Sequence, residues 1–142
     1  MSEGTLKLSI LSPERKLLTE VPVKEVTLTG SEGQIEILPG HAPMVGTFET
    51  GLFKSTGADG TGKEELGFIS TGFFEVQDDK VTVLAEVLER SQEIDVERAK
   101  RAQKKAEDKL RDTSLEMQEF KKYQLKLQRS LIRQQVAGRT LH

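Results

Sequence analysis

The stretch G-S-E-G-Q-I-E-I-L-P-G-H-A-P-M, residues 30–44, shapes the organisation of the first part of the chain. Two turns rich in Gly and Pro enclose a short run, residues 34–38, in which Ile35 and Ile37 share a parity and point into one core. His41, the only histidine away from the C-terminus, lies in the second turn. The segment therefore predicts a strand between two tight turns, and it is the first place to look for chemistry.

On both sides of this segment, apolar and polar residues alternate over short runs, which is the period of two expected of half-buried strands. Turn residues separate the runs, and Asp78-Asp79 indicates a tight hairpin. Short strands at such spacing favour an antiparallel sandwich or barrel over parallel β-α-β units. The predicted strands cover residues 5–11, 23–29, 34–38, 44–48, 52–56, 66–70, 73–77 and 81–87.

The period of the pattern changes near Glu89, where a helical part begins. No Gly or Pro occurs from Ile94 until Gly138. Asp95 predicts an N-cap with Ile94 and Ala99 as a hydrophobic staple, so the first helix should run over about residues 95–111. Thr113 followed by Glu116 is a capping-box signal for a second helix over about residues 114–136. The predicted domains are a β domain, residues 1–88, and an antiparallel helical hairpin, residues 89–142.

The seam between the two helices is predicted to be thin. The first helix offers a stripe of small residues, and the apolar stripe of the second helix has Tyr123 beside it. Because alanine buries little apolar area, we expect the hairpin to be weakly closed and able to exchange its folded-back packing for a partner. The two stripes are Ala99, Ala102, Ala106 and Leu110, and Phe120, Leu127 and Leu131.

Composition limits the classes of protein that fit. Of 142 residues, 35% are hydrophobic and 31% charged, which indicates a lean core with a large solvated surface. There is no cysteine, so neither a disulfide framework nor a thiolate site is available. No apolar run approaches the roughly 20 residues of a membrane span, and the N-terminus lacks a signal sequence, so we expect an intracellular, unprocessed chain.

Charge is divided unevenly along the chain. Residues 1–88 contain 14 acidic and 7 basic side chains, whereas residues 89–142 contain 9 acidic and 14 basic ones. Beyond Glu119 every charged side chain is basic, and four of these follow helical spacing along one face of the second helix: Lys122, Lys126, Arg129 and Arg133. This face is either simply solvated or a docking surface for an acidic partner.

The sequence contains no residue pattern typical of a catalytic site or a metal site. The run G-A-D-G-T-G-K, residues 57–63, has phosphate-loop spacing, but Glu64 stands where Ser or Thr must bind magnesium, and a strand follows instead of a helix. His41 has no second internal histidine or cysteine for a metal site or proton relay. The basic helix lacks interleaved aromatic residues, which argues against nucleic-acid binding. We therefore predict no catalytic residue and no metal ligand.

Three motifs together resemble the epsilon subunit of bacterial F-type ATP synthase. They are the opening stretch, the run I-S-T-G-F-F-E-V-Q-D-D-K-V-T-V-L-A-E from Ile69, and I-D-V-E-R-A-K from Ile94. The resemblance implies a β-sandwich followed by two C-terminal helices in a non-catalytic rotor subunit of the central stalk. Such a subunit couples proton translocation through the ring of c subunits to ATP synthesis, and its helices inhibit ATP hydrolysis.

The resemblance also implies partners and a location. The β-sandwich would contact the gamma subunit and the c-subunit ring, with Ser31, Glu32 and His41 as candidate contact residues. The basic face of the second helix, Lys122, Lys126, Arg129 and Arg133, would meet the beta and alpha subunits of the catalytic head. The chain would then be peripheral, on the cytoplasmic face of the bacterial inner membrane, and associated with the membrane only through the complex.

Some members of this family bind ATP through the pattern I/L-D-x-x-R-A. The resemblance therefore implies a possible regulatory ATP site, with no cofactor required. Two departures stand against it: Lys105 occupies a position where the best binders have arginine, and the arginine pair of the second helix is displaced by one residue. Alternatively, Asp95 simply caps the helix and pairs with Arg98. The implied residues are Glu89, Ile94, Asp95, Arg98, Ala99, Arg129 and Arg133.

Two other readings remain open at this point. One is a free-standing ATP-sensing adaptor with the same β-sandwich and helical hairpin. The other is the mitochondrial counterpart of the subunit, which the absence of a transit-like N-terminus makes the weaker of the two.

Overall fold

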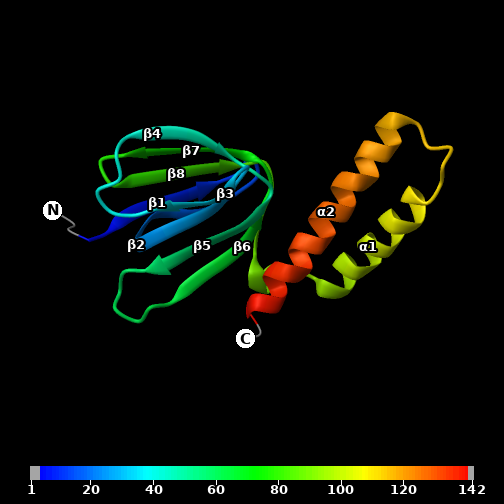
Figure 1. Ribbon diagram of the computed structural model, residues 1–142. Coiled ribbons are helices and arrows are strands. Elements are labelled where there is room, and N and C mark those ends of the chain that lie inside the picture. Colours follow the sequence, from blue (N-terminus) through cyan, green and yellow to red (C-terminus); the bar gives the residue numbers. More distant parts are fainter. Residues whose placement is uncertain (1–3, 141–142) are drawn as a thin grey trace. The chain divides into compact units, whose positions relative to one another are not determined.

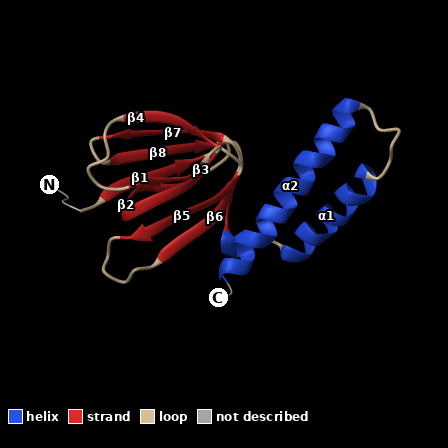
Figure 2. Cartoon of the chain, in the orientation of Figure 1, coloured by secondary structure: helices blue, strands red, loops and turns tan. Residues whose placement is uncertain are grey.

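The computed structural model describes residues 4–140 of the chain. Contacts divide it into two compact units, the first ending at Arg90 and the second beginning at Ser91. The first unit contains only strands and loops, and the second contains only helical elements and their connections (Figure 2). This is the predicted order of a β-sandwich followed by two C-terminal helices, and the fold class is confirmed.

Nine strands of the first unit form one hydrogen-bonded sheet in the order β4-β7-β8-β1-β2-β5-β6-β9, with β3 also paired to β2 (Figure 1). The alternation of apolar and polar residues predicted most of these strands, but β9 and the first part of β2, residues 16–22, are additions that the sequence did not predict. The strands are β1 (Leu6–Leu11), β2 (Lys16–Gly30), β3 (Gly33–Ile37), β4 (Met44–Phe48), β5 (Gly51–Gly57), β6 (Glu64–Ile69), β7 (Gly72–Gln77), β8 (Lys80–Ala85) and β9 (Leu88–Arg90).

The long strand β2 joins the two layers of the sandwich. Its first half pairs with β1, and its second half pairs with β3 on one side and β5 on the other. Glu20, whose φ of 47° is in the left-handed region, lies where the register of the β1–β2 pair shifts. A bulge of this kind bends and twists a strand, so one continuous strand can serve both layers.

The pairing of β1 with β8 is parallel, whereas the other strand pairs described are antiparallel. This differs from the purely antiparallel sandwich predicted from the sequence. The two strands are far apart in the chain, so no hairpin turn imposes an antiparallel direction on them. The buried side chains of the two layers then meet in one core, whose largest members are Phe48, Phe53 and Phe74.

The second unit begins with the short 3₁₀ turn η1 (Ser91–Glu93) and continues with α1 (Val96–Leu110) and α2 (Met117–Thr140). Asp95 is the N-cap of α1, as predicted, because its carboxylate accepts a hydrogen bond of 3.1 Å from the Arg98 amide. The two helices lie side by side and run in opposite directions (Figure 2). Within residues 4–140, neither helix is long and apolar enough to cross a membrane.

The connection between the helices differs from the predicted capping box. Asp112 Oδ1 accepts hydrogen bonds from the Ser114 amide at 2.9 Å and from the Ser114 hydroxyl at 2.6 Å. This local turn competes with helix formation, and α2 begins at Met117 instead of near residue 114. At its other end α2 continues through Gly138 to Thr140, beyond the predicted end at residue 136.

The seam between α1 and α2 is as thin as predicted on the α1 side, where Ala99 and Ala106 are buried. The prediction for α2 was wrong for two of its three residues, because Leu127 is half-buried but Phe120 and Leu131 are 37% and 46% exposed, and Tyr123 is the large residue buried on this helix. Ala102, predicted to lie in the seam, is also exposed. The residues buried on α2 besides Tyr123 are Ser130, Val136 and Ala137, so small side chains are buried on both helices of the hairpin.

Candidate functional site

The turn between β2 and β3 presents Ser31 and Glu32 to solvent. Gly30 and Gly33 are register partners that close this hairpin, and both side chains at its tip are exposed. A Cβ on Gly30 would approach the Gly33 carbonyl oxygen to 2.8 Å, so this tight closure depends on glycine. The hairpin therefore offers a carboxylate and a hydroxyl at a defined position on the surface of the β domain.

The turn between β3 and β4, residues 38–43, places His41 half-buried beside an exposed leucine. The His41 amide donates to the Leu38 carbonyl oxygen at 3.1 Å, and His41 Nδ1 lies 2.7 Å from the Ala42 carbonyl oxygen. Because a carbonyl oxygen only accepts, this contact is a hydrogen bond when Nδ1 carries the proton, and the imidazole then supports the turn. No group of three His, Cys, Asp or Glu side chains within residues 4–140 is arranged to hold a metal ion.

Exposed apolar side chains lie in this turn and on the β4–β7 pair that follows it, and none of them was predicted from the sequence to be a contact residue. Leu38 is 47% exposed, Met44 43%, Val45 71% and Phe73 52%. Val45 and Phe73 lie on the same face of the β4–β7 pair, since Val45 is opposite Glu75 and Phe73 is opposite Thr47. The adjacent pairs Met44-Val45 and Phe73-Phe74 carried the signal, because alternation in a strand forces one member of each pair outward.

The four basic residues predicted to form one face of α2 have two different environments. Lys122 and Lys126 are exposed, and each ammonium lies 5.5 Å from the centroid of the buried Tyr123 ring. Arg129 and Arg133 are half-buried. Cation–π contact at this distance orients the two lysines without neutralising them, so they remain available to an acidic partner.

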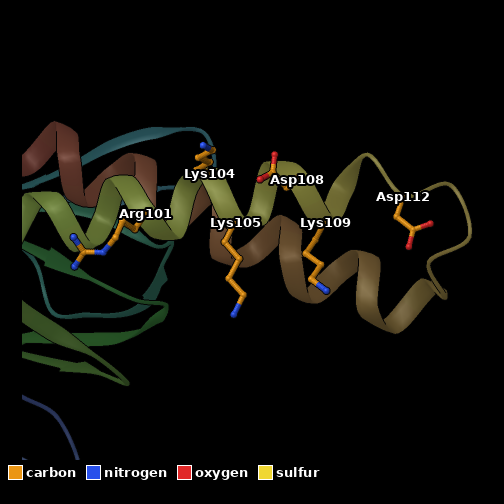
Figure 3. A pocket seen from close by; sticks show the side chains of 6 residues that line it. All are labelled: Arg101, Lys104, Lys105, Asp108, Lys109 and Asp112. Atoms are coloured by element: carbon orange, nitrogen blue, oxygen red, sulfur yellow. The ribbon is translucent and has the colours of Figure 1, made fainter.

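A further set of basic side chains lies along the outward surface of α1, and only Lys105 among them was singled out from the sequence. Figure 3 shows Lys105 and Lys109 extending from one side of the helix and Lys104 from the other. Asp108 and Asp112 accompany them, with Asp108 paired to Arg111 at 2.9 Å. The surface depression here is lined by Arg101, Lys104, Lys105, Asp108, Lys109 and Asp112.

The residues implied for ATP are only partly brought together. The Asp95 carboxylate caps α1 by accepting a hydrogen bond from the Arg98 amide. Ile94 and Ala99 are buried, and the Arg98 side chain is exposed. A hydrogen bond of 2.8 Å from Gln134 to Gln103 sets the register of the helices. From that register and a rise of 1.5 Å per residue, Arg133 and Arg129 lie about 9 and about 15 Å along the hairpin from Arg98. Glu89 belongs to β9 of the first unit, opposite Phe68.

The loop with phosphate-loop spacing is an ordinary connection between β5 and β6. Asp59 Oδ1 accepts hydrogen bonds from the Thr61 hydroxyl at 2.6 Å and from the Thr61 amide at 3.0 Å. These bonds lower the pKa of Asp59 and close the loop on itself. Because β6 follows the loop, the helix N-terminus that would hold a phosphate is missing here, in agreement with the sequence analysis.

Comparison with known proteins supports one family over nearly the whole chain. The family model for the ATP synthase, Delta/Epsilon chain, beta-sandwich domain matches residues 5–91, and that for the long alpha-helix domain matches residues 92–138. The ATP synthase epsilon chain of Trichlorobacter lovleyi is 46% identical over 136 residues, 94% of each chain. That of Geotalea daltonii is 43% identical over 135 residues, 95% of each chain.

The fold is also similar to that of a chain in a solved structure of the Euglena gracilis mitochondrial ATP synthase. The TM-score is 0.81 at 24% identity, and the similarity covers 98% of this chain and 82% of that one. At 24% sequence identity, this similarity shows only that the two chains share a fold. It extends across both the strands and the helices.

Proposed function

Because the chain belongs to the ATP synthase Delta/Epsilon chain family, we propose that it works as the epsilon-type subunit of the central stalk, coupling ion-driven rotation to ATP synthesis. The observation that carries this proposal is the succession of both family domains in one chain, in order and without a gap, over residues 5–138. An epsilon chain is a non-catalytic subunit of the complex. Its contribution therefore lies in its surfaces and not in a reaction.

The β domain supplies the contact with the rotor in this proposal. Its partners are the gamma subunit and the c-subunit ring, and the contact residues include Ser31, Glu32 and His41. Support comes from two closed turns whose backbone is fixed, and from the neighbouring apolar side chains Leu38 and Val45, which are far more exposed than a core residue. A rigid apolar surface beside polar turns is the composition of a specific interface.

The helical unit supplies the regulation in this proposal. Its helices open and bind the beta and alpha subunits, inhibiting ATP hydrolysis. The thin seam supports this, because the buried alanines of α1, with a polar Gln103–Gln134 layer, give a smaller closing free energy than a leucine seam would. The basic side chains of α1 and α2, Lys122 and Lys126 among them, suit an acidic partner surface.

Regulatory ATP is a finer part of the proposal, and a pair of variants separates it from helix capping. Asp95→Asn keeps a side-chain oxygen that can cap α1 but removes the carboxylate, whereas Asp95→Ala removes both. If ATP binds through this residue, Asp95→Asn should weaken ATP binding in a calorimetric titration while leaving the melting of α1 nearly unchanged. Equal ATP affinity of the wild type and both variants would show that Asp95 does not contribute to an ATP site.

The proposed location follows from the proposed partners. The subunit would be peripheral, on the cytoplasmic face of the bacterial inner membrane, and held there by the complex. Stoichiometric co-purification with gamma and the c ring tests this assignment. Recovery of the chain free of both, with ATP bound, would favour the adaptor reading instead.

Removal of the helical unit tests the inhibitory role. The cut belongs after Arg90, because β9 pairs with β6 and the Arg90 guanidinium lies 3.1 Å from Glu65. ATP hydrolysis by an enzyme reassembled with residues 1–90 should rise above that with the full chain, while its co-purification with gamma persists. Unchanged hydrolysis would contradict the inhibitory role.

A further inference from the structure

The turn formed by residues 38–43 is attached to a distant part of the chain. The Gly40 amide donates a hydrogen bond of 2.8 Å to Asp79 Oδ1, across 39 positions of sequence. Asp79 lies in the tight turn between β7 and β8, at the same end of the β domain as the connection from β3 to β4 (Figure 1). One carboxylate thus joins two loops that the sequence analysis treated separately.

The Asp79 carboxylate projects from a rigid support. Asp78 and Asp79 have φ values of 51° and 61°, the left-handed conformation of a tight hairpin turn, which aspartate tolerates better than most residues. The hairpin is closed by the Gln77–Lys80 pair of the β7–β8 ladder. In addition, the Asp79 carbonyl oxygen accepts a hydrogen bond of 2.8 Å from the Lys7 amide at the start of β1.

The turn that receives this bond has no regular ladder of its own. Gly40 has a φ of 86°, a conformation that favours glycine, and the His41 amide closes the turn onto Leu38. The hydrogen bond from the Gly40 amide to the Asp79 carboxylate connects this turn to the loop between β7 and β8. Leu38, the first residue of this turn, has an exposed side chain, as does Met44, which directly follows the turn.

We propose that Asp79 is a positioning residue, which holds the 38–43 turn in the conformation that its binding partner recognises. This inference rests on the proposed contact role of that turn. A turn already held in the bound conformation loses less conformational entropy on association, so its partner binds more tightly. The Asp79–Gly40 bond would add affinity in this way without any contact between Asp79 and the partner.

Three variants of the full chain test the proposal. Asp79→Gly removes the carboxylate but favours the same left-handed backbone, and Asp79→Asn keeps both the acceptor oxygen and that backbone preference. Asp78→Gly is the matched control, because it makes the same change at the neighbouring left-handed position. Amide hydrogen exchange at Gly40 reports the turn, and co-assembly with gamma and the c ring reports binding.

Asp79→Gly should speed exchange at Gly40 by about tenfold and weaken co-assembly severalfold, as expected for the loss of one hydrogen bond. Asp79→Asn should restore both readouts to within about twofold of wild type, and Asp78→Gly should leave both unchanged. A purely structural role for Asp79 would change overall stability without this rescue and without the selective effect on Gly40. Unchanged Gly40 exchange in Asp79→Gly would overturn the proposal.

The variant Leu38→Ser separates this inference from the proposed function. Leu38 is 47% exposed, so the change removes a contact surface with little loss of core packing. If Leu38→Ser weakens co-assembly and Asp79→Gly does not, the positioning role fails while the contact role of the turn stands. If neither variant weakens co-assembly, the contact role fails and the positioning role fails with it.

Discussion

Gln134 Nε2 donates a hydrogen bond of 2.8 Å to Gln103 Oε1 across the seam between α1 and α2. The same Gln134 amide group lies 3.3 Å from the Ser130 carbonyl oxygen, and Ser130 itself is 1% exposed. The middle of the hairpin therefore contains a polar layer made by Gln103, Gln134 and Ser130. Such a layer sets the register of two helices while contributing less closing free energy than apolar packing.

Replacing both glutamines by leucine should close the hairpin more firmly. The double variant Gln103→Leu with Gln134→Leu exchanges a polar pair for apolar surface, and we expect about 1–2 kcal/mol of added stability in the helical unit. Hydrogen exchange of the α1 amides measures this directly. If the hairpin opens to inhibit, the same variant should inhibit ATP hydrolysis less than wild type, whereas slower α1 exchange with unchanged inhibition would contradict opening as the switch.

Tyr123 should contribute most of the packing free energy on the α2 side of the seam. Tyr123→Ala removes a ring that is 8% exposed, and we expect a loss of about 2–3 kcal/mol in the helical unit. Tyr123→Phe is the control, since it keeps the ring and its contacts with Lys122 and Lys126. Thermal unfolding followed by far-ultraviolet circular dichroism would show the loss, and equal melting of the two variants would show that the ring is not what holds the seam.

Gly67 allows close contact between β6 and its neighbours. A Cβ at this position would overlap the Phe53 ring and approach the Glu89 carbonyl oxygen to 2.6 Å. We therefore expect Gly67→Ala to destabilise the β domain by about 2 kcal/mol in urea unfolding. Gly138→Ala is the opposite control, because its Cβ meets nothing within 4 Å and lies inside α2, where alanine is favoured by about 1 kcal/mol.

The loop between β5 and β6 should become less stable in acid. Hydrogen bonds from the Thr61 hydroxyl and amide lower the pKa of Asp59 in the folded state. A lowered folded-state pKa means that the bonds stabilise the loop above the unfolded pKa, and that this contribution is lost as the pH falls through the folded one. In Thr61→Ala, a carboxyl NMR titration should show a higher pKa for Asp59.

Asp112 provides the internal control for that titration. Its pKa is also lowered, in this case by the Ser114 hydroxyl and amide in the connection between the helices. Thr61→Ala should leave the Asp112 titration where it is, and Ser114→Ala should raise the pKa of Asp112 and leave that of Asp59. If Thr61→Ala changed the pKa values of both Asp59 and Asp112, the substitution would have altered the whole protein and not only the loop between β5 and β6.

Features that depend on residues close together in the sequence were predictable from it. Ile35 and Ile37 indicated a strand, and Asp95 an N-cap, because both signals depend on residues within a few positions. The predicted stripe of α2 was wrong at Phe120, since Phe120 and Tyr123 are equally plausible core residues on an isolated helix. The packing of α2 in the folded unit decided between them, since Tyr123 is 8% exposed and Phe120 is 37% exposed.

By itself, the sequence determined the alternation that makes strands, the change of period that makes helices, the cap of α1 and the family. These follow from local spacing and from motifs that are contiguous in the chain. Only the tertiary structure decided that β1 and β8 pair in parallel, that β2 serves both layers, and that Asp79 reaches Gly40. Each of these joins segments that no short-range pattern connects, so each depends on how the whole β domain closes around its core.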